Sequence, residues 1–156
     1  MHDYDPATRL LRQRRGQHIG RLLLRAHRAF SARAVTKLKE RGYDRLSLAH
    51  IGLLPHLDEE GTRITTLAER AGMTKQGMGQ LVRDLERQGY VTRTPDLADR
   101  RAILVCFTDA GRQLLRDAVA VTAKLEAEYE AVLGERVMVD LKAALAALAE
   151  PEHRQS

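Results

Sequence analysis

Four polar residues in the middle of the chain have the types and spacing needed to read the edges of DNA bases. Lys75 and Gln76 directly follow Thr74, and Gln80 lies about one helical turn beyond Gln76. A glutamine amide can bind N6 and N7 of adenine together, and a lysine can bind O6 and N7 of guanine or a phosphate. These residues predict a DNA-reading surface, provided that one helix face presents them. The alternative is a polar helix face that is merely solvated.

Gly79 and Arg83 extend the predicted surface. An exposed glycine within a helix costs roughly 1 kcal/mol relative to alanine, so Gly79 needs a compensating role. Close approach of the helix backbone to DNA is one such role. Arg83 is suited to a phosphate contact. The same interpretation, and the alternative of a plain surface arginine, stay open for three further residues, Arg63, Arg70 and Arg93.

A second group of residues that could bind DNA is Asp99, Arg100 and Arg101, which lie together in a polar stretch. Minor grooves of A·T-rich DNA are narrow and electronegative, and they favour an inserted arginine. Asp99 is suited to hydrogen-bond its own loop or to pair with Arg101, which would hold Arg100 outward. The roles of the two arginines can be exchanged, and a solvated turn is the alternative.

The residues around Thr74 predict the helix that would carry the first group. Thr74 is a typical N-cap, and Gly89 is typical of a helix end. A shorter helix is predicted just before it, at Thr66–Ala71, because Thr66 and Glu69 have the spacing of a capping box. Between Thr74 and Gly89 the apolar residues recur at helical spacing, which leaves the polar residues on the opposite face: Met78, Leu81, Val82 and Leu85.

A hairpin is predicted after this helix. Tyr90–Thr94 and Ala102–Phe107 are apolar or rich in β-branched residues, and the polar loop 95–101 joins them. Helix, turn, helix and hairpin in this order predict a winged helix-turn-helix over residues 46–111. In that fold the second helix enters the DNA major groove, and the hairpin tip, or wing, reaches the neighbouring minor groove.

Long helices are predicted on both sides of this unit. A helix Ala7–Arg41 would be about 50 Å long, so part of it is expected to pack on a second chain. The fold class expected is therefore α+β and mostly α, with residues 7–42 and 112–149 as dimerisation helices. The remaining predicted helices are Leu48–Leu57, which Ser47 caps and Pro55 distorts, a helix from the cap Thr108 to about Leu133, and Glu135–Ala149.

The segments LAERAGMTKQGMGQLVRDLERQGYVTR and DLADRRAILVCFTDAG resemble the MarR family of transcriptional regulators. The wing signature of that family is Asp-x-Arg, five residues, Leu-Thr, two residues and Gly. Asp99, Arg101, Thr108 and Gly111 match it, and Phe107 stands where the family usually has leucine. The resemblance covers essentially the whole chain. It implies a homodimer that binds a near-palindromic operator in double-stranded DNA and responds to a small-molecule effector or an oxidant. We expect the regulator to be a repressor.

Candidates for the effector site are few. Cys106 is the chain's only cysteine, and we expect it to be a buried small hydrophobe rather than a redox sensor. Three histidines, His27, His50 and His56, could line the pocket that the family forms between dimer helices and winged helix. They are not joined by a cysteine or carboxylate at ligand spacing, so no metal and no other cofactor is expected. His18 is a further candidate for lining this pocket, and ordinary surface or packing histidines are the alternative for all four.

Composition narrows the class of protein. The 156 residues fit one domain, and the net charge of +5 suits an anionic partner. No apolar run approaches the roughly 20 residues that cross a bilayer, which predicts a cytoplasmic protein with no membrane partner. The chain lacks GxSxG, P-loop, HExxH and dinucleotide-binding motifs, so an enzyme is not expected. The remaining alternative is a winged helix that serves as a protein-interaction module, which salt-dependent retardation of DNA would exclude.

Overall fold

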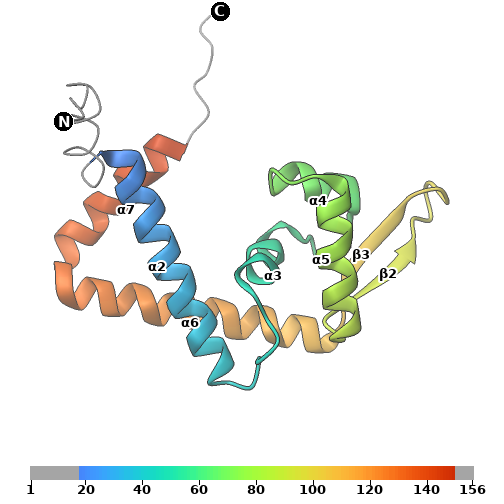
Figure 1. Ribbon diagram of the computed structural model, residues 1–156, viewed down its shortest axis with the longest axis horizontal. Helices are drawn as coiled ribbons and strands as arrows, with labels where there is room; N and C mark the ends of the chain where they lie inside the picture. Colours follow the sequence, from blue (N-terminus) through green and yellow to red (C-terminus); the bar gives the residue numbers. More distant parts are fainter. Residues whose placement is uncertain (1–17, 150–156) are drawn as a thin grey trace, which may run out of the picture.

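The computed structural model describes residues 18–149, and one long helix, α6, joins two arms of this part of the chain (Figure 1). The helices α2 and α7 lie at one end of α6, and α3, α4, α5 and the sheet lie at the other. In chain order the elements are α2 (Ile19–Lys39), α3 (Leu48–Leu53), the 3-10 turn η1 (Leu54–His56), β1 (Thr62–Arg63), α4 (Ile64–Arg70), α5 (Lys75–Arg87), β2 (Val91–Pro95), β3 (Ile103–Phe107), α6 (Asp109–Leu133) and α7 (Glu135–Ala149).

The predicted fold class is confirmed, because the described residues are mostly helical and add a small antiparallel sheet. Within residues 18–149 this sheet has three strands in the order β1-β3-β2. The hairpin of β2 and β3 pairs Val91 with Phe107 and Pro95 with Ile103. The short strand β1 was not predicted. It pairs Thr62 with Val105, and two residues are too few to show a period-2 pattern.

The helix α5 begins as the sequence predicts. Thr74 has an extended backbone, and its Oγ1 accepts a hydrogen bond from the backbone N–H of Gly77 at 3.1 Å. Met78, Val82 and Leu85 are fully buried against the rest of the winged helix. After α5, Gly89 takes a φ of +82°, a conformation that residues with a side chain rarely adopt.

The predicted capping box of Thr66 and Glu69 is wrong. The helix α4 begins two residues earlier, at Ile64, with Arg63 at the N-cap position. Arg63 is the last residue of β1, so the pairing of β1 with β3 fixes where the chain turns into α4. The end of α4 is predicted correctly, because Ala71 is its C-cap and Gly72 takes a φ of +61°.

The long helices agree with the sequence at most of their ends. Thr108 caps α6 by accepting the N–H of Gly111 at 3.0 Å, and Gly134, with a φ of +86°, separates α6 from α7. A continuous helix from Ala7 to Arg41 is wrong at His18. There the backbone is extended, and Nδ1 accepts the N–H of Arg21 at 3.3 Å, so α2 starts at Ile19. The predicted helix residues 7–17 lie outside the described part.

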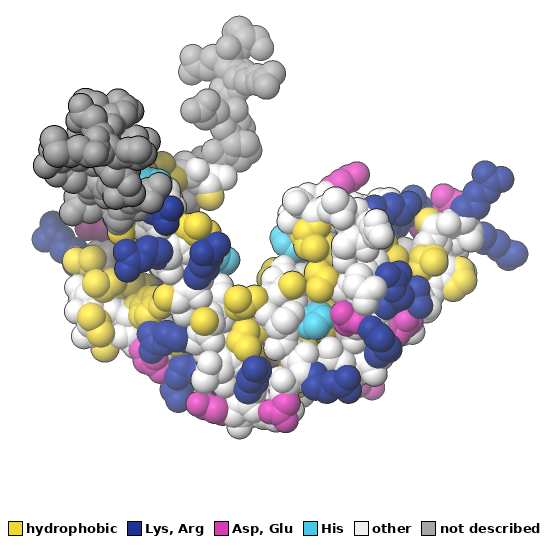
Figure 2. Space-filling model, in the orientation of Figure 1, with side chains coloured by type: hydrophobic (Ala, Val, Ile, Leu, Met, Phe, Trp, Pro, Cys, Tyr) yellow, Lys and Arg dark blue, Asp and Glu magenta, His cyan; other side chains and the backbone are white. Residues whose placement is uncertain are grey.

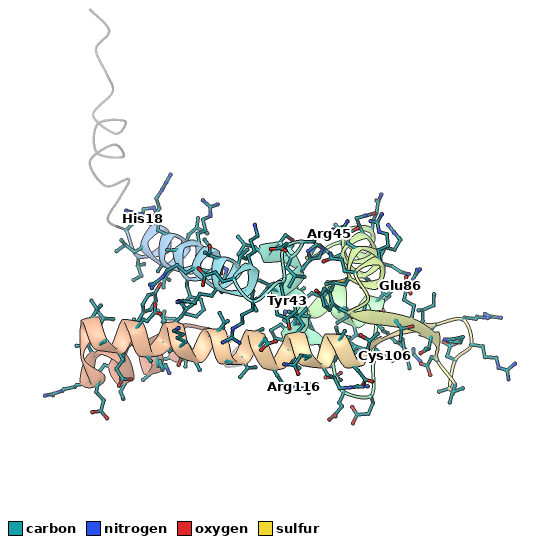
Figure 3. The ribbon with its side chains drawn as sticks, turned by 90° about the horizontal axis from the view of Figure 1, so that it is seen from below. His18, Tyr43, Arg45, Glu86, Cys106 and Arg116 are labelled. Atoms are coloured by element: carbon teal, nitrogen blue, oxygen red, sulfur yellow. The ribbon has the colours of Figure 1, made fainter. Side chains whose placement is uncertain are left out.

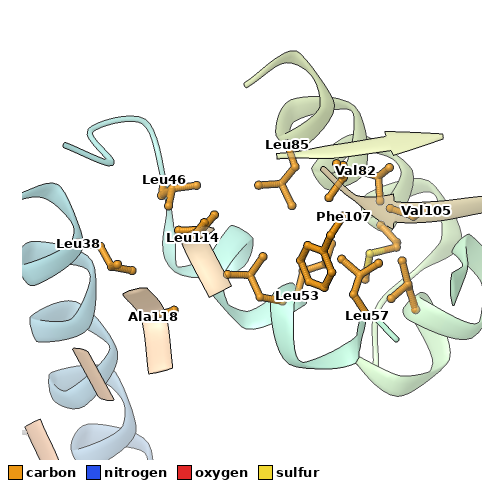
Figure 4. Packing of buried hydrophobic residues seen from close by; sticks show 14 of the residues in the cluster. Leu38, Leu46, Leu53, Leu57, Val82, Leu85, Val105, Phe107, Leu114 and Ala118 are labelled. Atoms are coloured by element: carbon orange, nitrogen blue, oxygen red, sulfur yellow. The ribbon is translucent and has the colours of Figure 1, made fainter. Parts of the chain in front are cut away.

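The core runs without a break from α2 through α6 into the winged helix (Figure 4). Leu38 of α2, Leu53 of α3 and Leu114 of α6 are almost completely buried in it. Pro55 ends the regular part of α3 and turns it into η1, as the sequence predicts. One continuous core therefore connects α2 with the strands of the wing. Among the described helices, none has the length and apolar character to cross a membrane.

Candidate nucleic-acid interface

The predicted DNA-reading residues lie together on the exposed face of α5. Lys75, Gln76, Gln80 and Arg83 are all exposed, whereas Met78, Val82 and Leu85 on the opposite face are buried and Leu81 is half-buried. Within the described part of the chain, neither Lys75 nor Gln76 forms a side-chain hydrogen bond or an ion pair. Both are therefore available to a ligand in the first turn of α5.

Gly79 does not serve the packing of this chain. A Cβ added at Gly79 would have the guanidinium Nη1 of Arg83, at 3.5 Å, as its nearest neighbour, which is an ordinary contact with a flexible side chain. The fold therefore tolerates a larger residue at this position. Among the described residues no packing contact requires glycine at this position, and close approach of the helix backbone to DNA stays a prediction.

The second turn of α5 carries a chain of side-chain hydrogen bonds. Nε2 of Gln80 donates to Oδ1 of Asp84 at 3.1 Å, and Nη2 of Arg83 donates to Oε1 of Gln80 at 2.9 Å. The Arg87 guanidinium also binds Asp84, and this hydrogen bond is the main reason that the pKa of Asp84 is lowered. Gln80 and Arg83 are thus exposed but oriented, in contrast to Lys75 and Gln76.

The wing tip presents two arginine side chains to solvent. Arg100 and Arg101 are exposed, and neither pairs with an acidic side chain within residues 18–149. Of the two roles considered for Asp99, the structure contains the loop contact: its Oδ1 accepts the backbone N–H of Arg101 at 3.1 Å. Lys and Arg side chains project from the tip of the wing and follow the same side of the molecule across α5 (Figure 2).

The base of the wing is held by Arg63, which reaches across from β1. Its Nε donates to Oδ2 of Asp96 at 2.9 Å and its Nη2 to the same oxygen at 2.5 Å. Asp96 is buried, and its other oxygen accepts the N–H of Ala98 at 2.9 Å. The Ala98 N–H, followed by Arg63, lowers the pKa of this carboxyl group. Arg63 therefore fixes the wing loop rather than pointing freely to solvent.

Two further predicted phosphate contacts are also engaged within the chain. Arg70 donates to the backbone oxygen of His56 at 2.8 Å and to Oδ2 of Asp58 at 2.9 Å. Arg93 pairs with Glu86 at 2.7 Å, and its hydrogen bond lowers the pKa of the Glu86 carboxyl. Both arginine side chains are more than a third exposed, so each keeps part of its surface toward solvent.

The three candidate effector histidines are not brought together. His27 lines a largely apolar cavity of about 430 Å³ between α2, α6 and α7. His50 is buried beneath α5, where its ring completes a capping box with Ser47, and His56 lies in η1. No cluster of three His, Cys, Asp or Glu side chains that could hold a metal occurs between residues 18 and 149.

The surroundings of Cys106 and of His50 differ from those expected from the sequence. Cys106 is only half-buried, with its Sγ 3.8 Å from Oγ1 of Thr94, so it is less enclosed than predicted. Figure 3 shows Cys106 beside the wing strands, with Arg45 and Glu86 on the side of α2 and α5. The sequence also missed the capping role of His50, because this position of a capping box is usually Glu or Gln.

A helix-turn-helix with an exposed polar second helix and a cation-tipped hairpin defines the winged-helix class of proteins. The sequence model of the MarR family matches residues 46–102. HTH-type transcriptional regulator SarZ of Staphylococcus saprophyticus is 30% identical over 108 residues, which are 69% of this chain and 71% of SarZ. The chain belongs to the MarR family of transcriptional regulators.

Solved structures agree with this assignment. CouR from Rhodococcus jostii RHA1, solved with p-coumaroyl-CoA, is 28% identical, with a TM-score of 0.70 over 87% of this chain and 94% of CouR. The transcriptional repressor CouR bound to a 23-mer DNA duplex is 25% identical, with a TM-score of 0.74 over 88% of this chain and 96% of that one.

Proposed function

We propose that this protein is a sequence-specific repressor that binds a near-palindromic operator in double-stranded DNA as a homodimer and responds to a small-molecule effector. The observation that carries the proposal is the joint exposure of Lys75 and Gln76 on α5 and of Arg100 and Arg101 on the wing, without partners among the described residues. The structural relative CouR is a repressor that has been solved on a DNA duplex. A winged helix that binds only protein would not need cations at both places.

The homodimer is supported by apolar surface that one chain leaves uncovered. Ile19 is 66% exposed and Leu148 is 67% exposed, although both lie in regular helices. Hydrophobic side chains gather at the end of the molecule that holds α2 and α7 (Figure 2). Exposed apolar surface of this kind marks an association site. Six further residues contribute to it: Leu22, Leu24, Val137, Val139, Leu141 and Leu145. We assign dimerisation to these helices and DNA binding to residues 46–111.

The cavity beside His27 is the place that we propose for the effector. Phe30, Tyr129 and Met138 make its walls apolar, and His27, Glu126 and Lys142 add polar groups. Because the cavity lies at the proposed dimer end, a bound molecule would act on the arrangement of the two copies. His50 and His56 line a different part of the fold and are not assigned to the effector.

DNA selection from a random duplex pool, followed by affinity measurement at several salt concentrations, tests the proposal. The wild type should enrich one related set of sequences. The double variant Arg100→Ala, Arg101→Ala should bind the selected DNA more weakly, with a salt slope lower by about two per dimer if one arginine in each wing contacts phosphate.

The matched control is Arg116→Ala, Lys124→Ala, which removes the same charge from exposed positions on α6. The control should keep a salt slope close to that of the wild type. A folded wing variant with unchanged affinity and unchanged salt dependence would contradict the proposed DNA-binding surface. Binding that is weakened by small aromatic acids, but unaffected by them in a His27→Ala variant, would support the effector site.

A further inference from the structure

Asp84 lies at the centre of the side-chain network on the DNA-facing helix α5. One of its oxygens, Oδ1, accepts hydrogen bonds from both Arg87 and Nε2 of Gln80, the latter at 3.1 Å. The other end of the Gln80 amide, Oε1, accepts from Nη2 of Arg83 at 2.9 Å. An ionised carboxylate only accepts hydrogen bonds, and a guanidinium group only donates them. The two neighbours therefore fix which end of the Gln80 amide is nitrogen and which is oxygen.

The second carboxylate oxygen of Asp84 faces a buried histidine on another helix. His50 Nδ1 accepts the backbone N–H of Ser47 at 3.1 Å, so the hydrogen of a neutral ring lies on Nε2. Nε2 is buried without a hydrogen-bond partner among the described residues, and it lies 3.8 Å from Oδ2 of Asp84. The side chain of His50 is only 10% exposed. A buried donor without a partner is costly, so it favours a carboxylate beside it.

Asp84 lies between the buried ring of His50 and the exposed amide of Gln80. His50 is anchored in α3 by its capping box with Ser47, and it approaches Asp84 from the core side. Gln80 contacts Asp84 from the solvent side, at the exposed face of α5. The Gln80 amide is thereby oriented by a carboxylate that Arg87 binds at the surface of α5 and that the buried His50 ring faces from the core.

We propose that Asp84 is a positioning residue for sequence recognition, which holds the Gln80 amide in the orientation that reads an adenine. With one N–H bound to Asp84 and one lone pair bound to Arg83, the amide keeps one N–H for N7 of adenine and one lone pair for the N6 amino group. The inference rests on the proposed function, in which α5 lies in the major groove. It adds that base choice at one position depends on a residue that does not touch DNA.

Discrimination at a single base pair tests the inference. In DNA selected by the wild type, the base pair whose identity stops mattering in Gln80→Ala is taken as the Gln80 position. Asp84→Asn has the same shape, but its amide can donate or accept, so only Arg83 still favours one orientation of Gln80. It should lower the affinity ratio between the preferred and the substituted base pair about fivefold. In the Gln80→Ala background, Asp84→Asn should leave this ratio unchanged.

Two further variants separate positioning from charge and from folding. Asp109→Asn removes the same charge from a fully exposed site at the start of α6, and it should leave the discrimination unchanged. His50→Gln keeps a residue that suits a capping box with Ser47 but removes the ring that faces Asp84. It should lower discrimination at the same base pair, and it tests the inference even if Asp84→Asn fails to fold.

The outcomes are distinct. Unchanged discrimination in folded Asp84→Asn or in folded His50→Gln overturns the inference while the proposed function stands. An equal loss of affinity on all DNA, accompanied by a lower melting temperature, also overturns it, because that pattern indicates a purely structural role. If the wild type enriches no sequence at all, the proposed function fails, and the inference fails with it.

Discussion

Gln76 and Gln80 are the same residue type one helical turn apart, but their surroundings differ. Gln80 is held at both ends of its amide by Asp84 and Arg83. Gln76 has no side-chain partner among the described residues and lies next to the N-terminus of α5. A side chain without internal partners loses no hydrogen bond within the protein when it binds a base. Gln76 is therefore the residue whose removal should report most directly on base contacts.

We predict that Gln76→Ala weakens binding to the selected operator by about 1–3 kcal/mol and leaves binding to random duplex DNA almost unchanged. The reason is that a base contact contributes only where the correct base is present. Fluorescence anisotropy with both DNAs at one salt concentration measures the difference. Gln88→Ala, at the other end of α5, is the control. Equal losses on the two DNAs would show that Gln76 does not read bases.

At the residue scale, contacts that depend on nearby sequence could be predicted, and contacts between distant residues could not. The cap at Thr74 and the apolar face of α5 follow from spacing within a few residues. By contrast, Arg63 and Asp96 are 33 residues apart, and only the pairing of β1 with β3 brings them together. The same limit explains why Arg63 was considered as a phosphate contact.

The junction of the wing with α6 has no room for an added methyl group at Gly111. Gly111, in the first turn of α6, is buried, and a Cβ added there would lie 1.9 Å from the backbone oxygen of Tyr90. That oxygen also accepts the N–H of Thr108 at 3.1 Å, and Oγ1 of Thr108 donates to the backbone oxygen of Gly89. The start of α6 is thus bound directly to the chain that enters β2.

Gly111→Ala should therefore destabilise the protein by about 3 kcal/mol, because backbone must move to admit one methyl group. For a chain of this size the melting temperature should fall by roughly 6–12 °C, which calorimetry can measure. Gly52→Ala is the matched control. Gly52 also lies in a helix, α3, and a Cβ added there would meet nothing within 4 Å. It should leave stability unchanged or raise it by up to about 1 kcal/mol. Equal melting temperatures for the two variants would contradict the packing at this junction.

A second junction joins the end of α2 to α6 through a carboxylate. Tyr43 donates a hydrogen bond to Oδ2 of Asp117 at 2.5 Å, and Arg41 pairs with Oδ1 at 3.0 Å. The Tyr43 hydrogen bond is the largest influence that lowers the pKa of Asp117. Burial, followed by Asp117, raises the pKa of Tyr43 to about 12. Figure 3 shows Tyr43 between the end of α2 and the ribbon of α6.

We expect Tyr43→Phe to lower the free energy of unfolding by about 1 kcal/mol at neutral pH. A lowered carboxyl pKa stabilises the fold above the unfolded value of about 3.9, and this contribution is lost as pH falls through the folded pKa. The gap between wild type and variant should therefore shrink below about pH 4 in urea titrations. Tyr90→Phe is the control, because no hydrogen bond from the Tyr90 hydroxyl to Asp117 is present. A gap that stays constant to pH 3 would contradict the role of Asp117.

At the element scale, helix ends that use their own residues could be predicted, and ends that depend on pairing could not. Thr108 and Gly134 are local signals for the limits of α6, and both are used. The start of α4 depends instead on the pairing of β1 with β3. This pairing places the N-cap at Arg63, so the capping pattern at Thr66 is not used. No proline marks the start of α2 at His18. The helix predicted from apolar periodicity therefore extends past the true start.

On the scale of the whole molecule, light scattering should give a mass of about 35 kDa, twice the 17.5 kDa of one chain. Leu141→Glu, Leu148→Glu places charges in the exposed apolar surface of α7 and should yield the monomer mass. Leu97→Glu is the control, because Leu97 is 98% exposed in the wing loop. A wild-type mass of 17.5 kDa at micromolar concentration would contradict the dimer.

The helix α6 also has a mechanical consequence. Its 25 residues form an unbroken rod about 37 Å long, packed against β3 at one end and α7 at the other. When one end of such a rod is held, a tilt of only about 5° moves the other end by about 3 Å, close to the 3.4 Å rise of one base pair. If two copies of the chain pair as proposed, a tilt of α6 that begins beside the His27 cavity would therefore shift each wing along a duplex by a distance of this size.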